Sequence, residues 1–558
     1  MIKLRLKKYL DQCFQQAVED GLWSDAAANS YTVEDPKFDG QGDFSTNAAM
    51  VIAGKEKKLT GKKVNPRQIA EKLVEMLGKE TSLFEKVEIA GPGFINFFMK
   101  ESVWPSVIPF VCQQQDDFGR ITEKNGKRVL VEFVSANPTG PLSVGHGRQA
   151  VLGDAIARLL ENAGYDVERE YYYNDAGRQM RVLGESTRAR YLEELGLPFD
   201  FPEDGYQGEY IREIAQSLIS ESGDSLKDTK DVTPFKEQAE KAIFVDIDQT
   251  LKRFGIAFDT YYNEHSLYEN GLIDDVVATL RDKGLVYEQD DAVWFKTSEF
   301  GQEQDRVIIK STGEPTYRLP DIAYHREKFK RGYDWMVNVF GADHIATVPD
   351  VLAGVKALGY DDSKVTVVLH QFVTLMREGK QVKMSTRKAN FITVDELLDE
   401  VGADVARFFF LMRKADSQLE FDLDLATKQS QENPVYYVQY GHARLASISR
   451  KASDEAVEKG SLDNAPLHLL NLPEEQKLLK TIAAYPALVK NAAEDLAPHR
   501  IVFYLQDLAG QFHSYYNKHR VVSDDKDLSS ARLWLGEALQ IVLHNGLTLL
   551  GMSAPDSM

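Results

Sequence analysis

Three glycines and a histidine follow an apolar run and could form an anion-binding turn. The run is RVLVEFV, from Arg128 to Val134, and Gly140, Gly145, His146 and Gly147 come after it. Glycine lets the backbone approach a ligand closely, and the dipole of a helix that begins here favours negative charge. The spacing fits neither G-x-x-x-x-G-K-[ST] nor G-x-G-x-x-G, which argues against P-loop hydrolases and dinucleotide oxidoreductases.

A second group of residues suited to phosphate chemistry is KMSTRK, from Lys383 to Lys388. It follows a strand-like run and lies in a polar stretch, where it could offer mobile cations to a polyphosphate. Stabilisation of negative charge is most of what phosphoryl displacement requires of a protein. The two motifs therefore predict a polyphosphate site built from two loops.

The elements around these motifs predict a parallel sheet. RVLVEFV is a continuous β-branched run, typical of a strand buried on both faces. A helix is expected from Gln149 to Gly164 and a second strand at DVEREYYY, which completes a βαβ unit. YDWMVNVFGADH and KVTVVLHQF predict two more strands, each ending in a polar loop. Open α/β sheets bind ligands at such carboxyl ends.

The chain is too long for a single core, and we expect three or four domains, of which three can be placed. An α/β module is predicted over residues 1–115, with helices at 4–18 and 66–77. A catalytic domain follows over 116–430, with a helical insertion at about 180–300. Residues 431–558 predict a helical bundle, because 433–452 and 499–520 carry apolar and aromatic residues at helical spacing.

Composition restricts the function and the compartment. The formal net charge is −20 and the pI is near 5.1, which argues against a protein that coats nucleic acid nonspecifically, although a local basic patch is still compatible with it. The first twenty residues mix charged with apolar residues, and no long apolar run occurs, so we expect neither a secretory signal nor a membrane span. Cys13 and Cys112 lie far apart, which predicts a cytoplasmic protein without a disulfide framework or a Cys-based zinc site.

The motifs resemble those of a known family. SVGH (Ser143 to His146) and KMST (Lys383 to Thr386) are similar to the two signatures of class I aminoacyl-tRNA synthetases. Within that class the chain resembles the arginyl-tRNA synthetase family over nearly its whole length. The segments that carry this resemblance are GDFSTNAA, AGPGFINF, VEFVSANPTGPLSVGHGR, YYNDAGRQM, FGADH, NPVYYVQYGHARLASISRKA and GLTLLGMSAP.

The resemblance implies a multidomain α/β fold and a ligase activity. It implies a Rossmann-type parallel-sheet catalytic domain, an N-terminal α/β module, an insertion that handles the tRNA acceptor end, and a C-terminal α-helical anticodon-binding bundle. The implied reaction joins L-arginine to its tRNA through an arginyl-adenylate, with AMP and diphosphate released from ATP. Mg²⁺ would accompany the ATP, and no tightly bound protein metal is implied. The family also implies a monomer that needs bound tRNA to activate arginine.

The resemblance assigns roles to individual residues. A guanidinium is planar and always charged, so carboxylates suit it best. The expected arginine-binding residues are Glu132, Asn137, Tyr317 and Asp321. The expected ATP-binding residues are Gly145, His146, Gly147, Gly341, Asp343, Lys383, Met384 and Ser385. The expected catalytic residues are His146, Ser143, Lys383 and Arg387.

Two positions depart from the class signatures. Ser143 stands where the first signature usually has a histidine, so a hydroxyl replaces a chargeable donor. Thr386 stands where the second signature has a lysine, although Arg387 and Lys388 follow directly. Loss of one contact to the transition state could cost on the order of 3 kcal/mol.

The C-terminal helices carry two sets of residues that predict contacts with tRNA. Tyr436, Tyr440 and Arg444 lie at successive i+4 steps, which alternates stacking surface with charge. The second set is Phe512, Tyr515, Tyr516 and Arg520, of which Tyr516 and Arg520 are the stronger candidates. Packing in the core is the competing interpretation for each tyrosine.

Two other functions remain open at this stage. The departures at Ser143 and Thr386 are compatible with a catalytically weak paralogue that binds tRNA as a regulator. A class I synthetase for another amino acid is the third hypothesis. An intact arginine pocket argues against the regulator, and the acids of that pocket and the absence of a Cys-based zinc site argue against a cysteine enzyme.

Overall fold

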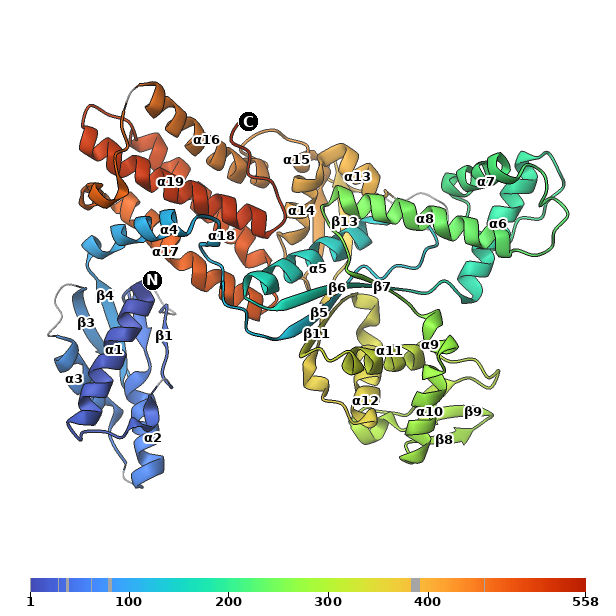
Figure 1. Cartoon of the computed structure of the whole chain (residues 1–558), viewed down its shortest axis with the longest axis horizontal. Coiled ribbons are helices and arrows are strands. Elements are labelled where there is room, and N and C mark those ends of the chain that lie inside the picture. The colour runs from blue at the N-terminus through green and yellow to red at the C-terminus, as the bar shows by residue number, and fades with distance from the viewer. Residues whose placement is uncertain are drawn as a thin grey trace.

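The computed structural model of the chain describes residues 2–28, 30–36, 40–61, 63–78, 83–382, 392–455 and 457–558. Figure 1 shows the central parallel sheet joined to an N-terminal module, a C-terminal group of helices and a projecting group of helices. None of the helices in these ranges is long and apolar enough to span a membrane.

The N-terminal module packs helices against an antiparallel sheet with strand order β1-β2-β4-β3. Its helices at 2–19 and 66–77 agree with the predicted ones. The elements are α1 (Ile2–Glu19), β1 (Val33–Glu34), β2 (Phe44–Thr46), α2 (Ala48–Thr60), α3 (Pro66–Leu77), β3 (Phe84–Ala90) and β4 (Phe94–Met99). Helix α4 (Val107–Gln114) then packs against two C-terminal helices, α17 (Pro473–Glu494) and α19 (Lys526–Leu549).

The catalytic sheet is parallel throughout, with strand order β12-β11-β5-β6-β7. Its strands are β5 (Arg128–Glu132), β6 (Asp166–Tyr173), β7 (Thr260–Asn263), β11 (Trp335–Gly341) and β12 (Val365–His370). Alternate side chains of β5 enter different cores: Val129 and Val131 pack with α5 (Val144–Asn162), and Leu130 packs with Met336 and Val365. The predicted burial of this strand on both faces is confirmed.

The first strand ends earlier than its apolar run. We predicted a strand through Val134, but β5 ends at Glu132. Val134 and Ser135 have φ of 66° and 45°, a left-handed conformation that non-glycine residues rarely adopt and that turns the chain out of the sheet. Such strain is found most often where a site requires it.

The stretch predicted as one helical insertion, residues 180–300, is divided by the structure. Helices α6 (Gly177–Glu194), α7 (Glu209–Ser222) and α8 (Thr233–Arg253) pack together and project from the body. Strand β7 then returns to the central sheet, so the rest of the stretch is separate from these helices. It contains α9 (His265–Glu269), α10 (Leu272–Asp282), β8 (Val286–Gln289) and β9 (Ala292–Phe295), and β10 (Arg306–Ile309) completes an antiparallel sheet.

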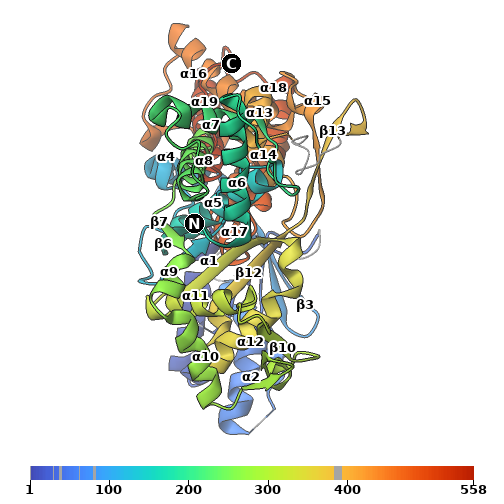
Figure 2. The same ribbon diagram turned by 90° about the vertical axis from the view of Figure 1, so that its right-hand side faces the viewer.

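The remaining elements complete the catalytic part and the C-terminal bundle. They are α11 (Arg318–Lys330), α12 (Val348–Leu358), β13 (Val373–Arg377), β14 (Lys380–Gln381), α13 (Val394–Val401), α14 (Ala403–Leu411), β15 (Leu419–Asp422), α15 (Leu423–Ala426), α16 (Pro434–Asp454), α17 (Pro473–Glu494), α18 (His499–Lys518) and α19 (Lys526–Leu549). In Figure 2 the parallel sheet lies between the C-terminal helices above and α10 and α12 below. The predicted helices at 433–452 and 499–520 are confirmed.

A buried arginine connects three distant segments. Arg407 of α14 is fully buried and forms an ion pair with Asp154 of α5. Its Nη1 donates to the Phe254 carbonyl and its Nε to the Leu550 carbonyl, each at 2.9 Å. Gly551 has φ +75°, and a Cβ there would lie 2.3 Å from Arg407 Nη2. Only glycine therefore fits beside this guanidinium.

Candidate functional site

Helix α5 begins five residues before the predicted position. Ser143 precedes its first turn, and the backbone N–H of Ser143 donates to His146 Nδ1 at 3.2 Å. This bond caps the helix, which explains the early start. Gly145 and Gly147 therefore lie in the first turns of the helix and not in a loop. The helix N-terminus still faces the carboxyl edge of the sheet, where its dipole favours an anion.

The two helical glycines have different surroundings. A Cβ on Gly145 would meet only Ser143 Oγ, at 3.7 Å, so this side of the turn is open. A Cβ on Gly147 would lie 3.0 Å from Val394 and 3.3 Å from Phe410. Gly147 therefore lets α13 and α14 pack closely on α5. This packing differs from the phosphate contact that the sequence predicted for Gly147.

Residues at the ends of β11 and β12 lie next to this helix terminus. Gly341 and His370 are register partners on the two strands. Asp343 follows in a short 3-10 turn (Ala342–Ala346), and a Cβ on Gly341 would lie 2.4 Å from Asp343 Oδ1. Burial lowers the pKa of His146, and the nearby Asp343 opposes this shift. The predicted residues Gly341, Asp343 and His146 thus converge at the point where the strand order reverses.

The predictions for KMSTRK lie outside the described residues. Lys383, Met384, Ser385, Thr386, Arg387 and Lys388 all fall in the gap between residues 382 and 392. Their roles remain predictions from the sequence.

Asp321 lies in a cluster of acidic side chains. Burial, together with Glu132 and Glu264, raises its pKa to about 8, and Lys328 opposes the shift. Within the described part of the chain its carboxylate has no hydrogen-bond partner. A carboxylate that lies among other acids and lacks a hydrogen-bond partner is unfavourable as an anion and is stabilised by a cationic ligand.

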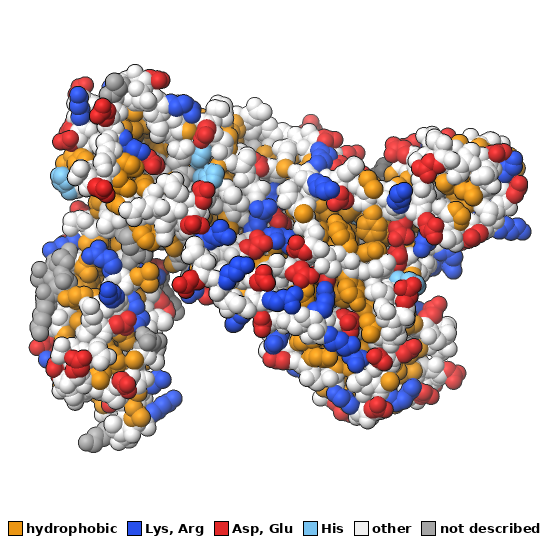
Figure 3. Space-filling view, viewed as in Figure 1, with side chains coloured by type: hydrophobic (Ala, Val, Ile, Leu, Met, Phe, Trp, Pro, Cys, Tyr) orange, Lys and Arg blue, Asp and Glu red, His pale blue; other side chains and the backbone are white. Residues whose placement is uncertain are grey.

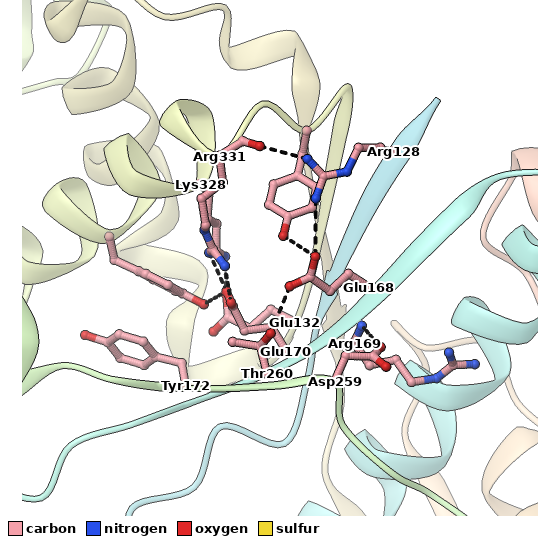
Figure 4. Close-up of polar contacts among 12 residues, drawn as sticks. Arg128, Glu132, Glu168, Arg169, Glu170, Tyr172, Asp259, Thr260, Lys328 and Arg331 are labelled. Carbon is pink, nitrogen blue, oxygen red and sulfur yellow. Dashed lines mark hydrogen bonds and ion pairs between the residues drawn. The ribbon is translucent and has the colours of Figure 1, made fainter. Parts of the chain in front are cut away.

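Glu132 is already paired inside the protein. Lys328 Nζ forms an ion pair with Glu132 Oε2 and donates to Asn338 Oδ1 at 2.9 Å, and Ser135 Oγ donates to Glu132 Oε1 at 3.1 Å. Figure 4 shows Lys328 of α11 reaching Glu132 at the end of β5. Sequence analysis missed Lys328, because a lysine in the charged segment HREKFK gives no sign of burial.

The other two predicted arginine-binding residues are arranged differently. Tyr317 precedes α11 and is 84% exposed, whereas Asp321 is half-buried, so the two side chains do not share one environment. The amide of Asn137 donates to Gln179 Oε1 at 3.0 Å, and its oxygen accepts from the backbone of Asn174 at 3.1 Å. Asn137 therefore helps to order the segment after β6.

A second ion pair fixes α11 on the sheet. Arg331 makes two contacts with the fully buried Glu170 of β6, and the hydroxyl of Tyr324 donates to the same carboxylate. Glu170 lies beside Glu132 in the sheet register, so Lys328 of α11 and Arg331, which directly follows this helix, bind neighbouring carboxylates (Figure 4). These pairs fix the helix that carries Asp321.

The aromatic cluster of the C-terminal helices forms as predicted. The rings of Tyr436 and Tyr440 stack with centroids 6.1 Å apart at 17°. Arg444 donates to the Tyr440 hydroxyl at 2.7 Å, and its guanidinium lies 4.5 Å from the Tyr440 ring and 5.2 Å from the Tyr516 ring. All four side chains are half-buried. They present stacking surface and charge together.

The second predicted set separates into core and surface. Phe512 and Tyr515 are 1% and 2% exposed, and the Tyr515 hydroxyl donates to Glu475 at 2.9 Å. For these two the packing interpretation is correct. Arg520 is exposed at the end of α18. Figure 3 shows acidic and basic side chains intermixed over the face of the molecule seen in Figure 1.

Three family descriptions match successive parts of the chain. They are "Arginyl tRNA synthetase N terminal domain" over residues 5–99, "tRNA synthetases class I (R), catalytic domain" over 108–420, and "DALR anticodon binding domain" over 438–558. The match to the catalytic domain agrees with the parallel sheet and with the polar loops at the point where its strand order reverses. Together these features define the class of protein. The fold and the site are those of a class I aminoacyl-tRNA synthetase.

Similar proteins narrow the class to one family. An arginine–tRNA ligase of Desulfotalea psychrophila is 65% identical over 558 residues, all of both chains, and one of Syntrophotalea carbinolica is 47% identical over 560 residues, again all of both chains. The arginyl-tRNA synthetase structure from Thermus thermophilus is 23% identical with a TM-score of 0.73 over all of both chains, which supports the fold. The chain belongs to the arginyl-tRNA synthetase family, the ligases that join arginine to tRNA with ATP. The predicted fold class, substrates and reaction are confirmed.

Proposed function

We propose that Asp321 binds the guanidinium of arginine. The observation that carries this proposal is the carboxylate of Asp321, which lies in a cluster of acids and has no hydrogen-bond partner among the residues that the structure describes. Glu132 and Asn137 complete the pocket from the end of β5, and Glu132 contributes a carboxylate whose charge is partly balanced by Lys328. Tyr317, whose side chain is exposed, contacts the bound amino acid at the entrance of the pocket. A cation satisfies this cluster, whereas an uncharged side chain leaves it unpaired, which makes the pocket selective.

The nucleotide binds between α5 and the ends of β11 and β12. His146 and the open turn at Gly145 contact the phosphates, and Gly341 and Asp343 contact the ribose. Ser143 acts by orienting His146 through the 3.2 Å backbone hydrogen bond. Lys383, Met384, Ser385 and Arg387 supply the remaining contacts and the positive charge. Mg²⁺ accompanies ATP, because the triphosphate itself supplies the oxygen ligands that this ion prefers.

The chemistry follows from this placement. An oxygen of the arginine carboxylate attacks the α-phosphorus, the bond to diphosphate breaks, and an arginyl-adenylate remains. A ribose hydroxyl at the end of the tRNA then attacks the carbonyl carbon, and AMP leaves. Proximity and charge stabilisation account for both steps, and no covalent bond to the protein is needed.

Recognition of tRNA uses the C-terminal cluster. Bases of the anticodon loop stack on Tyr436, Tyr440 and Tyr516, and Arg444 and Arg520 contact the backbone. We place the domain boundaries at 1–115, 116–430 and 431–558, and we propose that a cytoplasmic monomer carries out the reaction.

The test is arginine-dependent exchange of labelled diphosphate into ATP, with and without tRNA for arginine. If arginine is the one amino acid that supports this exchange, the result supports the proposed arginine pocket. Asp321→Asn should raise the KM for arginine far more than the KM for ATP, whereas the exposed Asp282→Asn should change neither. Equal effects on both substrates would remove Asp321 from the pocket.

The same assay locates the catalytic cation. Lys383→Ala should lower turnover more than Arg387→Ala. If Lys383→Ala leaves turnover intact while Arg387→Ala abolishes it, the cation is Arg387 and the proposed role of Lys383 fails.

A further inference from the structure

A histidine at the end of β12 has an unused nitrogen. His370 is 7% exposed, and its Nδ1 lies 3.3 Å from the Gln371 carbonyl oxygen. Its Nε2 is buried and has no hydrogen-bond partner among the described residues. A buried polar atom without a partner costs free energy, so such atoms are rare unless a ligand satisfies them.

The unused nitrogen lies close to residues that we propose bind the nucleotide. A Cβ on Gly341 would lie 4.0 Å from His370 Nε2 and 2.4 Å from Asp343 Oδ1. The imidazole and the carboxylate therefore flank the bare Cα of Gly341. His146 and Asp343 both interact electrostatically with His370, which places the three groups near one another.

The hydrogen-bonding character of Nε2 follows from its ring. Nδ1 faces a carbonyl oxygen, which can only accept, so Nδ1 carries the proton and Nε2 is an acceptor. Burial, together with Arg148 and His146, lowers the pKa of His370 to about 4, so the ring is neutral at neutral pH. Two acceptors, Nε2 and the Asp343 carboxylate, thus lie side by side, as two adjacent hydroxyl donors require.

We propose that His370 binds the ribose of ATP, with Nε2 accepting a hydrogen bond from one hydroxyl of the cis-diol while Asp343 accepts from the other. The proposal rests on the nucleotide site proposed above and adds a residue to it. His370 distinguishes ribonucleotides from deoxyribonucleotides. It acts on binding of ATP and not on the transfer of arginine.

The test compares ATP with its 2′-deoxy and 3′-deoxy analogues in aminoacylation of tRNA by the wild type and by His370→Ala. In the wild type the analogue that loses the bond to His370 should raise the nucleotide KM by about threefold to tenfold, the effect of one neutral hydrogen bond, and the analogue that loses the bond to the Asp343 carboxylate should raise it more. In His370→Ala the penalty for one analogue should disappear, and the KM for arginine should stay unchanged. Persistence of both penalties would overturn the proposal.

Variants separate a contact from a structural role. His370→Gln places an acceptor near the position of Nε2 and should keep both penalties, whereas His370→Asn, whose amide reaches only the position of Nδ1, should behave like His370→Ala. His468→Ala, an exposed histidine in the C-terminal part, should leave every KM unchanged. An equal loss in His370→Gln and His370→Ala would indicate a structural role and overturn the contact.

Two further arms distinguish this inference from the nucleotide site itself. Asp343→Ala should remove the penalty for the other deoxy analogue. If Asp343→Ala does so and His370→Ala does not, the site stands and the role of His370 fails. If neither variant changes a nucleotide KM, the proposed site fails. A triphosphate that lacks the 6-amino group of adenine should raise the nucleotide KM by the same factor in the wild type and in His370→Ala. If His370→Ala removed this penalty, His370 would contact the base, and the ribose assignment would be overturned.

Discussion

The acidic cluster around Asp321 predicts that arginine binding releases a proton. A pKa of about 8 leaves roughly nine-tenths of the Asp321 carboxyl groups protonated at pH 7. The guanidinium binds the ionised form, so the group must lose its proton when arginine enters. Because the pKa of this acid is raised, arginine binding should strengthen as the pH increases towards 8.

The size of this effect follows from the position of the pKa. The apparent KM for arginine scales with the inverse of the ionised fraction, which is about one-eleventh at pH 7 and one-half at pH 8. The KM should therefore fall about fivefold between pH 7 and pH 8. The cost of deprotonation at pH 7 corresponds to about 1.4 kcal/mol.

The assay is aminoacylation with saturating ATP and tRNA, with the KM for arginine measured from pH 6.5 to 8.5. Asp321→Asn cannot ionise, so its arginine KM should not vary with pH through this group and should exceed that of the wild type by roughly tenfold to a hundredfold at pH 8.5. Asp282→Asn, at an exposed helix end, should keep the wild-type profile. A flat wild-type profile, or a profile that persists in Asp321→Asn, would refute the reasoning.

Three further predictions concern stability and tRNA binding. Lys328→Met leaves Glu132 as an unpaired buried charge and should lower the free energy of unfolding by about 3–5 kcal/mol in chemical denaturation. Gly147→Ala places a methyl group 3.0 Å from Val394 and should cost about 1–3 kcal/mol in the same measurement. Tyr436→Ala removes a stacking surface worth about 1–3 kcal/mol and should raise the KM for tRNA without changing the KM for arginine.

Each of these predictions has a matched control. Lys330→Met alters an exposed lysine on the same helix and should leave stability nearly unchanged; comparable losses in both variants would contradict the buried pair. Gly54 has open space around it in α2, so Gly54→Ala should be neutral or stabilising. Tyr287 also stacks on an aromatic ring, that of Trp294, and Tyr287→Ala should leave the tRNA KM unchanged. A similar tRNA effect in both tyrosine variants would assign Tyr436 a packing role.

The sequence predicted the elements whose signal is local. The β-branched run at 128–134 and the helical spacing after Pro434 led to β5 and α16, because burial on both faces or on one face leaves a periodic pattern. The end of β5 was missed, since the left-handed backbone at Val134 and Ser135 has no glycine to mark it. The start of α5 was missed, because its cap is a histidine side chain that accepts from the Ser143 backbone.

The site was predicted less completely, for a physical reason. Lys328 and Arg331 lie in a charged segment, and their roles depend on partners that lie on strands far away in the sequence: Lys328 pairs with Glu132, and Arg331 pairs with Glu170. His370 is similar, since its exposure depends on how β12 packs beside β11. The sequence of one segment does not show which distant residues will contact it. Asp321 and Asp343 could be named as candidate binding residues because they lie in motifs that resemble those of the family.

Because of the contacts of Arg407, the C-terminal bundle of this enzyme cannot easily be replaced by that of another synthetase. In a chimaera whose residues 431–558 come from another synthetase, the new segment would have to supply the carbonyl that Leu550 offers and the bare Cα of Gly551. Otherwise the buried Nε of Arg407 would lose its acceptor, or a side chain would clash with the guanidinium. Because Arg407 also pairs with Asp154, such a clash would reach the helix that carries His146. Evolution can therefore remodel the surfaces of these domains separately, but substitutions at their common junction have to arise in concert.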